Sequence, residues 1–598
     1  MPLQGGLCRL YLPFGPQPDI SPPANDNQPD RIEILKPTPT PNPSDRARRS
    51  TDALALFAFC GFLFILGLQL VGLVGVDEPR YAQVAREMLA RHDWVTPVLY
   101  GHPWLEKPPL YYWCAMIAYK GAGEVSDVAA RLPSAVLSML LIIFIYVWSR
   151  HFRRGMQLDA ALITASAAII IGFGRSASTD IPLTAMFTAA MLCWYGWYVS
   201  DRRNWLLGFY FFSALATLAK GPVAVLLAGV IIIAFAALRR DWRLLGRTLW
   251  PVGIALYLAV TVPWFVAVQR ANPEFFRVFF LQHNLARFGS NLYRHKQPFW
   301  YYVPVALIAT LPWTVWLLHG MSDAWIALRR QFRAGQASGD NSAEPTFTFE
   351  IFLAVWAIIP IVFFSLSRSK LPGYILPSIP ALLIVGALAV HRRALREERP
   401  HWFAVCFHGL LLATIAAALC VAPRLMLKLP LSPQNLMVAA FAGTVVFLIV
   451  ALPLLTAGWR MLRFVTLLPL ILAVGFLLRA LTPLVDATQS SRPVAELLEL
   501  MDQPGSLPLT TFALNRNTAL GLAFYLDRRV APYEGLELSP AVYELPAAIP
   551  SGAHILVTRE GSLPKLSQLL TGRTVRFIGS YRAQHVEIYQ VSSALTAQ

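Results

Sequence analysis

Long apolar runs recur along the chain, and they constrain its fold more than any other feature of the sequence. A helix needs about 20 mostly apolar residues to cross a bilayer. Only 14% of the 598 residues are charged, whereas soluble domains carry roughly 25%. The sequence therefore predicts an α-helical polytopic membrane protein, with runs at 53–76, 128–149, 157–173, 181–199, 205–238, 248–268, 299–319, 349–366, 373–390, 401–421, 434–456 and 461–482.

The run at 205–238 is too long for one span, and it is interrupted by Lys220-Gly221-Pro222. Gly and Pro together favour a turn, so we expect two helices there. Because some of the other runs are short, the predicted number of spans is about 11–13.

Basic residues predict the orientation, because cytoplasmic loops of membrane proteins are enriched in Lys and Arg. With the N-terminus in the cytoplasm, every predicted inside connection carries Arg, and a single span at 205–238 would invert all later connections. The same bias accounts for the net charge of +17 without a nucleic-acid partner. The Arg-bearing connections are 150–156, 200–204, 239–247, 320–348, 391–400 and 457–461.

Composition divides the chain into three regions. Residues 1–50 are rich in Pro, Asp and Asn and are expected to form a disordered cytoplasmic tail. Residues 51–482 form the predicted membrane domain, whose long outer segment 77–127 should contain short interfacial helices and whose second large outer loop is 269–298. Residues 483–598 lose the membrane pattern and predict a small α/β periplasmic domain, with a helix at 493–500 and strands at 554–557 and 575–581.

The outer segments contain ionisable residues that topology alone does not explain. Lys and Arg are normally enriched in cytoplasmic loops, so basic residues in the outer segments need another explanation. An anionic ligand is one, since Arg forms two parallel hydrogen bonds to phosphate and Lys supplies a point charge. The mixture of charges indicates catalysis on a phosphate-bearing substrate, with a divalent metal as an option. The residues are Asp77, Glu78, Arg80, Glu106, Lys107, Arg175, Asp180, Lys220, His283, Arg287, Arg368 and Lys370, with Tyr374 beside the last.

Each of these residues also has a structural explanation. Asp77 could cap the helix that follows it. Glu106 and Lys107 could form an exposed ion pair. His283 could be an ordinary interfacial histidine, and Lys220 could extend its ammonium group toward the membrane surface. The case for a site therefore rests on their convergence at one face of the membrane.

Several motifs resemble the bacterial aminoarabinose transferases, the family that modifies lipid A. This branch of the GT-C glycosyltransferase superfamily is related to protein O-mannosyltransferases. The resemblance covers roughly residues 53–390 and is weak over the last third, and Pro79 stands where the family commonly has Ala. The matching motifs are DEPRYAQVAREMLARHDWVTPVLYGHPWLEKPPLYYW from residue 77, ARLPS at 130–134, LAKGP at 218–222, HNLARF through HKQPFWYY at 283–302, and SKLPGYILP at 369–377.

The resemblance implies a site for a sugar donor built on undecaprenyl phosphate. Asp77 takes the position of the family's catalytic carboxylate, and Asp180 that of a second carboxylate, with Lys107 as a further catalytic candidate. Glu106 and His283 take the positions of two metal ligands, for Zn or Mn/Mg. The residues assigned to the lipid phosphate and its cavity are Arg80, Lys107, Lys220, Arg287, Lys370 and Tyr374.

The predicted function is a lipid-dependent glycosyl transfer at the periplasmic face of the bacterial inner membrane. The donor would be an undecaprenyl phosphate-linked sugar, with 4-amino-4-deoxy-L-arabinose as the candidate, and the acceptor lipid A or another envelope molecule. One alternative is an enzyme like the protein O-mannosyltransferases, with a polypeptide acceptor. Another is a transporter or flippase for polyprenyl lipids, which would show inverted halves with broken helices near the membrane midplane.

Overall fold

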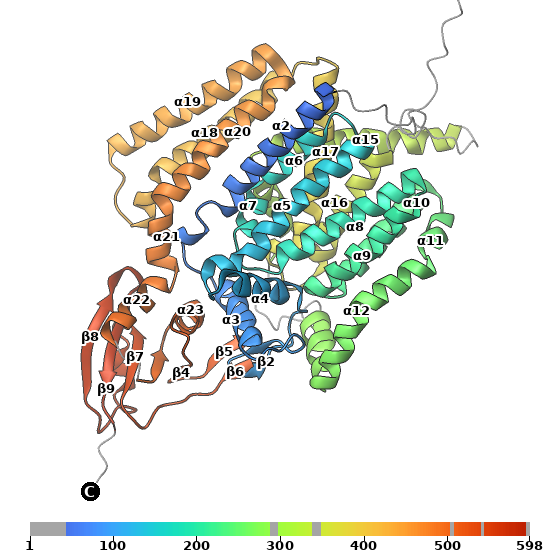
Figure 1. Cartoon of the computed structure of the whole chain (residues 1–598). Coiled ribbons are helices and arrows are strands. Elements are labelled where there is room, and N and C mark those ends of the chain that lie inside the picture. The colour runs from blue at the N-terminus through green and yellow to red at the C-terminus, as the bar shows by residue number, and fades with distance from the viewer. Residues whose placement is uncertain (1–42, 287–296, 338–347, 503–506, 540–542, 594–598) are drawn as a thin grey trace, which may run out of the picture.

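A bundle of helices with a small sheet domain at one end makes up the protein (Figure 1). The computed structural model describes residues 43–286, 297–337, 348–502, 507–539 and 543–593. The predicted fold class, a helical polytopic protein with a small C-terminal α/β domain, is confirmed. Of the predicted tail, only residues 43–50 lie within these ranges, and they are the start of the first helix.

The first half of the bundle begins with a span and two outer helices. These are α2 (Pro43–Cys60) with η1 (Gly61–Ile65) and η2 (Leu68–Leu70), then α3 (Asp77–Ala90), the strand pair β1 (Val98–Leu99) and β2 (His102–Pro103), and α4 (Leu110–Ala122). There follow α5 (Asp127–Phe152), α6 (Gln157–Ala165), α7 (Ala168–Gly174), α8 (Asp180–Ser200), α9 (Arg203–Lys220), α10 (Val223–Arg239), α11 (Arg243–Thr248), α12 (Pro251–Ala271) and η3 (Arg277–Ala286).

The second half of the bundle continues to the sheet domain. It contains η4 (Phe299–Tyr301), α14 (Tyr302–Ala309), α15 (Thr314–Ala337), α16 (Thr348–Leu366), η6 (Pro372–Ser378) and α17 (Ile379–Leu395). It ends with α18 (Trp402–Met426), α19 (Pro433–Ala457), η7 (Gly458–Met461), α20 (Leu462–Phe476), η8 (Leu477–Leu481) and α21 (Thr482–Gln489). The predicted domain boundary at 482 therefore falls at the start of α21.

The chain is a multi-pass membrane protein. Among the described residues, seven helical stretches are long and apolar enough to cross a membrane, or nine if each of two bent pairs is one span. The predicted number is larger for two reasons. It also counted α8, α9 and α10, and it divided the stretch 433–489 into α19 and α20, which the structure separates by a turn at Gly458. Most of α8 is buried against protein rather than lipid, so its sequence is less apolar than that of an outer span.

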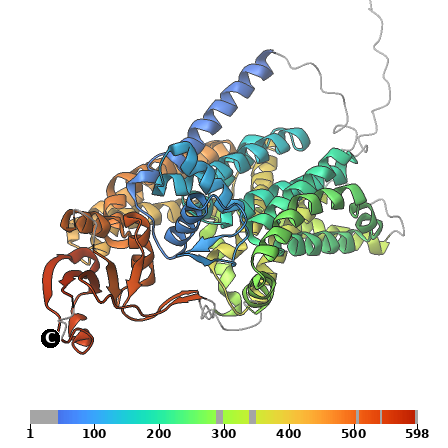
Figure 2. The ribbon, with the colours of Figure 1, turned by 60° about the horizontal axis from the view of Figure 1, so that its bottom comes forward.

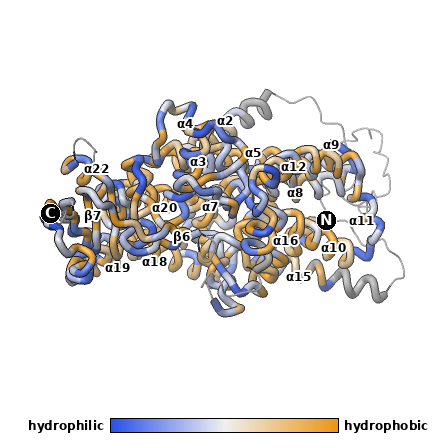
Figure 3. The backbone as a smooth tube through the Cα atoms, turned by 90° about the horizontal axis from the view of Figure 1, so that it is seen from below, coloured by the Kyte–Doolittle hydropathy of each residue, from blue (hydrophilic) through white to orange (hydrophobic). Residues whose placement is uncertain are grey.

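Local geometry confirms the predicted turn at 220–222 and explains where α5 begins. The turn at Lys220-Gly221-Pro222 separates α9 from α10, and Gly221 adopts a φ of 111°, which a residue with a side chain rarely reaches. Helix α5 begins at Asp127 because the Ser126 hydroxyl accepts a hydrogen bond from the Ala129 amide. Colours in Figure 3 are mostly hydrophobic along the bundle and mixed at α4 and in the C-terminal domain.

Two helices of the bundle are broken. The axis bends by 64° between α6 and α7 and by 116° between the segments 299–309 and 314–326. The breaks meet, because the Ala168 amide donates to the Leu311 carbonyl (2.8 Å) and the Trp313 indole N–H to the Ser166 hydroxyl (2.9 Å). Backbone groups freed at each break are thus satisfied by the other, and neither 165–168 nor 310–313 carries a charge.

The C-terminal domain holds a five-stranded sheet in the order β4-β3-β7-β9-β8. Its parallel pairs are β3–β4 and β3–β7, and β9 pairs antiparallel with β7 and β8. Helix α23 connects β3 to β4, as parallel strands require, and the predicted helix and strands appear as α22, β7 and β8. The bounds are α22 (Arg492–Met501), β3 (Leu509–Phe512), α23 (Arg516–Leu526), β4 (Val530–Pro532), β5 (Leu536–Ser539), β6 (Tyr543–Leu545), β7 (His554–Arg559), β8 (Val575–Tyr581) and β9 (Val586–Val591).

The C-terminal domain is docked on the bundle. Tyr525 accepts a hydrogen bond from the Leu73 amide (2.6 Å), and Arg86 of α3 donates to the Phe524 carbonyl (2.6 Å). Arg492 is paired with Asp127 at the start of α5 (3.1 Å). One hydrophobic core combines buried residues of α3, α4 and this domain. The domain is therefore fixed beside α3 and α4, at one end of the bundle, the α3–α4 end (Figure 1).

Candidate functional site

The first part of the candidate site is the opening turn of α3. Asp77 is the first residue of this helix, where a carboxylate is favoured by the helix dipole. Val76 holds the capping position, so the alternative that Asp77 caps the helix is wrong. The Asp77 carboxylate instead forms an ion pair with Arg80 one turn on, and its side chain remains 55% exposed. Asp77 is thus an exposed acid that is paired with a cation.

Arg80 lies in a buried setting that keeps it charged. Its guanidinium contacts Asp77, donates to the Leu538 carbonyl (3.2 Å) and lies over the rings of Tyr81 (5.3 Å) and Trp104 (5.1 Å). Burial lowers the pKa of Arg80, but the Asp77 charge and its neighbours outweigh burial, and the net pKa is raised. Arg80 therefore offers a fixed positive charge beside Asp77.

A second cluster joins the EKP motif to η3. The Lys107 ammonium lies 2.6 Å from Nε2 of His283, and Nδ1 of that ring lies 3.8 Å from a carboxylate oxygen of Glu106. All three side chains are buried. The alternatives of an exposed Glu106–Lys107 pair and of an ordinary interfacial His283 are therefore wrong. With Lys107 as the donor to Nε2, the imidazole proton belongs on Nδ1, and a metal at Nδ1 would require that proton to move to Nε2, where it would replace the hydrogen bond from Lys107.

A third cluster lies where α8 begins and α9 ends. Lys220 forms an ion pair with Asp180, and its ammonium lies 5.4 Å from the centre of the Tyr374 ring. A side chain at Gly373 would come within 3.0 Å of the Asp180 carboxylate, so this glycine lets the 372–378 turn approach. Lys220 is thus paired with protein groups and does not reach out to the membrane surface.

The three clusters surround one tyrosine. Burial raises the pKa of Tyr81, and the negative charges of Asp77, Asp180 and Glu106 raise it further. The phenol therefore keeps its proton. Since the charges of all three carboxylates act on the same ring, the segments that carry them lie near one another, and Tyr81 is a further candidate that sequence reasoning missed.

Other predicted residues lie apart from these clusters. Lys370 is buried and donates to the carbonyls of Ser367 (2.5 Å) and Gln297 (3.2 Å), so it ties two outer segments together. Arg175 donates to the Leu63 carbonyl (2.9 Å) and holds a helix end. Arg287 lies outside the described residues.

A buried ion pair between Glu78, in the first turn of α3, and Arg131 of α5 was missed by sequence reasoning. Glu78 and Arg131 approach to 2.6 Å, with side chains only 7% and 5% exposed. The carboxylate also accepts from the amides of Val74 (2.8 Å) and Ala177 (2.8 Å). Arg131 also donates to the carbonyls of Leu68, Val71 and Gly72. The pair therefore fastens the segments before Asp77 and before Asp180 to α5. An arginine in an apolar run was the available signal.

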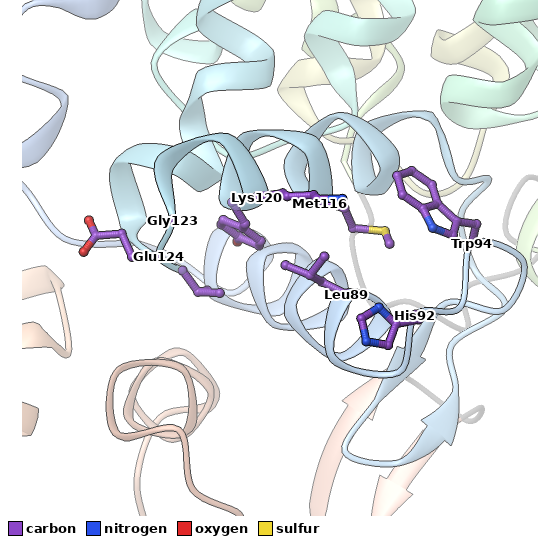
Figure 4. Close-up of a pocket in the computed structure, with 9 residues that line it drawn as sticks. Leu89, His92, Trp94, Met116, Lys120, Gly123 and Glu124 are labelled. Carbon is purple, nitrogen blue, oxygen red and sulfur yellow. The ribbon is translucent and has the colours of Figure 1, made fainter.

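An open pocket of about 510 Å³ lies between α3 and α4, but at the far end of α3. Leu89, Trp94, Met116 and Lys120 contribute to its lining, and none of the candidate site residues does (Figure 4). Leu89 follows Asp77 by twelve residues, which is about 18 Å along a helix. This pocket is therefore separate from the candidate site.

A metal is supported only in part. The described residues contain no group of three or more His, Cys, Asp or Glu side chains that could hold an ion. Glu106 and His283 do come together as the sequence led us to expect, and Oε1 of Glu106 is buried without a hydrogen-bond partner among the described residues. A buried carboxylate oxygen in that state is the kind of atom that a cation would satisfy. These two residues would supply two of the ligands that a divalent metal needs.

Comparison with known proteins identifies the family. The family described as dolichyl-phosphate-mannose-protein mannosyltransferase matches residues 50–279. The undecaprenyl phosphate-alpha-4-amino-4-deoxy-L-arabinose arabinosyl transferase of Pseudomonas aeruginosa is 32% identical over 354 residues, which is 58% of this chain and 61% of that protein. Its counterpart in Aeromonas hydrophila is 30% identical over 481 residues, 78% of this chain and 84% of that protein. The chain belongs to this arabinosyl transferase family.

Solved structures agree with the family in fold. The crystal structure of ArnT from Cupriavidus metallidurans bound to undecaprenyl phosphate has a TM-score of 0.73 at 24% identity, covering 91% of this chain and 99% of that one. Its apo form has a TM-score of 0.72 at 23% identity. The match with the Pseudomonas arabinosyl transferase covers about three fifths of that relative's length.

Proposed function

We propose that the chain is a glycosyltransferase of the bacterial inner membrane that transfers 4-amino-4-deoxy-L-arabinose from undecaprenyl phosphate to lipid A. The reaction takes place at the α3–α4 end, which faces the periplasm together with the C-terminal domain. Family membership supports the donor, since the arabinosyl transferases of Pseudomonas and Aeromonas carry that donor in their names. Lipid A is the acceptor that the sequence resemblance implies.

The observation that carries this proposal is the set of three cations held at one end of a membrane bundle. Arg80, Lys107 and Lys220 come from three different outer segments, and each is buried or nearly so beside an acidic or imidazole partner. A single Lys or Arg near a helix end is an ordinary interface anchor. Three of them, each beside one of the carboxylates whose charges act on Tyr81, provide the charge that a lipid phosphate requires.

The cations act on the leaving group. In the transfer, an acceptor oxygen attacks the anomeric carbon, the bond from that carbon to the phosphate oxygen breaks, and the polyprenyl phosphate departs with the electron pair. Arg80, Lys107 and Lys220 stabilise the charge that develops on the departing phosphate. Direct displacement inverts the anomeric centre, so donor and product should have opposite configurations at this carbon.

The Asp77 side chain is exposed, so an acceptor molecule can reach its carboxylate. If the acceptor is a phosphate of lipid A, its oxygen is already charged, and Asp77 orients the acceptor and balances Arg80. If the acceptor is a hydroxyl, Asp77 takes its proton. Asp180 is held by Lys220 and receives the amine of the sugar or sets the position of that lysine.

Glu106 and His283 would hold a divalent metal, with Zn or Mn as the ions that suit a carboxylate and an imidazole. When bound, such an ion supplies further positive charge for the departing phosphate. Lys107, whose ammonium contacts the same imidazole, supplies its own positive charge beside these two residues.

Mass spectrometry of lipid A tests the proposal. Cells with the gene deleted are complemented with wild type, with Asp77→Ala or with Asp93→Ala as a control from the same outer segment. We expect an aminoarabinose-sized mass that wild type and the control restore and Asp77→Ala does not. Lipid A that stays unchanged in all strains under inducing conditions would refute the acceptor, and sugar on secreted protein would then favour the polypeptide-acceptor alternative.

The transporter alternative has less support. Broken helices are present, but their breaks bond to each other and carry no charge, and the charged clusters lie at the α3–α4 end. Binding of the polyprenyl lipid by purified protein without any sugar transfer would revive it.

A further inference from the structure

The β5–β6 hairpin of the C-terminal domain extends away from the main sheet. Its strands pair only with each other, antiparallel, and form a separate two-stranded sheet. Figures 1 and 2 show it reaching from the red sheet to α3 and β2. A two-stranded hairpin is marginal by itself, so the surface it packs on must stabilise it.

That surface belongs to the candidate site. The Leu538 carbonyl on β5 accepts a hydrogen bond from Arg80 (3.2 Å), and this contact is buried. The Tyr543 hydroxyl on β6 accepts one from the Leu105 amide (3.2 Å). The Tyr543 ring also packs on Trp104, with centroids 4.9 Å apart and planes at 33°.

Through these contacts the hairpin holds two of the three phosphate cations. Arg80 is held directly by the Leu538 carbonyl and again through Trp104, whose ring lies under its guanidinium at 5.1 Å. Leu105 directly precedes Glu106 and Lys107, so fixing its amide fixes the start of the EKP motif.

The electrostatics agree with this placement. Burial raises the pKa of Tyr543 to about 12, and the charge of Glu106 contributes to the rise. The phenol therefore stays protonated at neutral pH. Its oxygen can accept from Leu105 while its own proton remains available to an acceptor.

We propose that the β5–β6 hairpin is a working part of the donor-phosphate site and that Tyr543 is a positioning residue, which aligns Arg80 through Trp104 and Lys107 through Leu105. This inference rests on the proposed function and gives the C-terminal domain a role in the reaction. The C-terminal domain thus contributes to the reaction, because its hairpin positions the two cations that bind the donor phosphate.

The test compares four variants of the full-length protein in detergent. Tyr543→Ala removes both the ring and the hydroxyl, and Tyr543→Phe removes only the hydroxyl. Tyr589→Ala and Tyr589→Phe are matched controls, because Tyr589 is a partly buried tyrosine of the same domain whose ring packs on Phe577 and whose hydroxyl bonds to Glu587. Each is assayed for binding of undecaprenyl phosphate, for kcat and KM of transfer to lipid A, and for thermal unfolding.

We expect Tyr543→Ala to lower kcat/KM by roughly 10- to 100-fold, because a small misplacement of charged groups has effects of that size. Tyr543→Phe should lose about two- to tenfold, the equivalent of one hydrogen bond. The controls should match wild type in both parameters. In a double-mutant cycle, Tyr543→Ala should cost less in the Arg80→Lys background than in wild type, since the part of its effect that acts on Arg80 is already lost and only the part that acts through Leu105 remains.

The outcomes separate the two proposals. Wild-type protein that neither binds undecaprenyl phosphate nor transfers sugar refutes the proposed function. An active wild type with Tyr543→Ala unchanged in kcat/KM refutes the hairpin's role, as does a lower melting temperature with unchanged kinetics or full additivity with Arg80→Lys. If Tyr543→Ala does not fold, the Tyr543→Phe kinetics and hydrogen exchange of the 98–107 segment decide in its place, and unchanged values for both overturn the inference.

Discussion

Replacing Glu78 by Gln should destabilise the protein far more than its conservative chemistry suggests. The Glu78 carboxylate accepts four hydrogen bonds, two from Arg131 and one each from the amides of Val74 and Ala177. A glutamine oxygen can serve only one side of this arrangement, and its NH₂ group would face two donors on the other. Two buried donors therefore lose their acceptor, and the Arg131 guanidinium loses its counter-charge.

The expected magnitude follows from this geometry. Removing one partner of a buried ion pair costs about 3–5 kcal/mol, because the other charge stays buried without compensation. The lost hydrogen bonds are part of the same effect and are not added. Glu274→Gln is the matched control, since Glu274 pairs with Arg277 at 3.0 Å but the two side chains are 68% and 62% exposed. An exposed pair contributes about 0–1 kcal/mol.

The free energy of unfolding is measured in mixed micelles by titration with a denaturing detergent, side by side for wild type and both variants. The reasoning is wrong if Glu78→Gln costs no more than Glu274→Gln.

Three further predictions follow from the site and the C-terminal domain. Lys220→Met should weaken binding of undecaprenyl phosphate by roughly 10- to 100-fold, because a hydrogen bond to a charged group is worth that much. Lys120→Met, at an exposed position of α4, is the control and should not weaken binding. Equal effects of the two variants in a binding titration would contradict this. Chelation with EDTA should slow transfer by wild type, and Glu106→Gln should be slow and insensitive to EDTA; a wild-type rate that EDTA leaves unchanged would reject the metal. Burial lowers the pKa of His554 in the folded protein below its usual 6.5. The unfolded state therefore binds the proton more tightly, and the C-terminal domain should lose stability as the pH falls below 6.5 toward the lowered pKa. The protection factors of the β7 amides, in which the intrinsic pH dependence of exchange is divided out, should therefore fall over that range. Protection factors that do not change with pH would refute the assignment.

Local patterns in the sequence were sufficient for most of the fold. Apolar length predicts a span wherever a helix meets lipid, and Gly with Pro predicts the break at Gly221 without any tertiary information. Strand β8 was predicted at 575–581, where the structure has it. Helix α8 was also found, although its surroundings are mostly protein and its composition is less apolar.

The site was predicted only where residue type carries the information. The charge of Asp77, Lys107 and Lys220 in the outer segments was sufficient to select them as candidates. The family motifs then selected the residues with which they pair. The Leu538 carbonyl left no such signal, because every residue has a carbonyl and only the register of β5 decides which one meets Arg80. Lys370 was placed with the phosphate group because of its charge, while its contacts are backbone carbonyls that the sequence does not reveal.

The order in which the chain is synthesised gives the hairpin's contacts a further consequence. Arg80 and the carbonyl that holds it are 458 residues apart in the sequence. A nascent chain that has already inserted all its spans still lacks residues 536–545, so its Arg80 and its EKP motif are not yet fixed. The contacts that hold Arg80 and the EKP motif are therefore completed last, and a chain cut short after its final span would lack them.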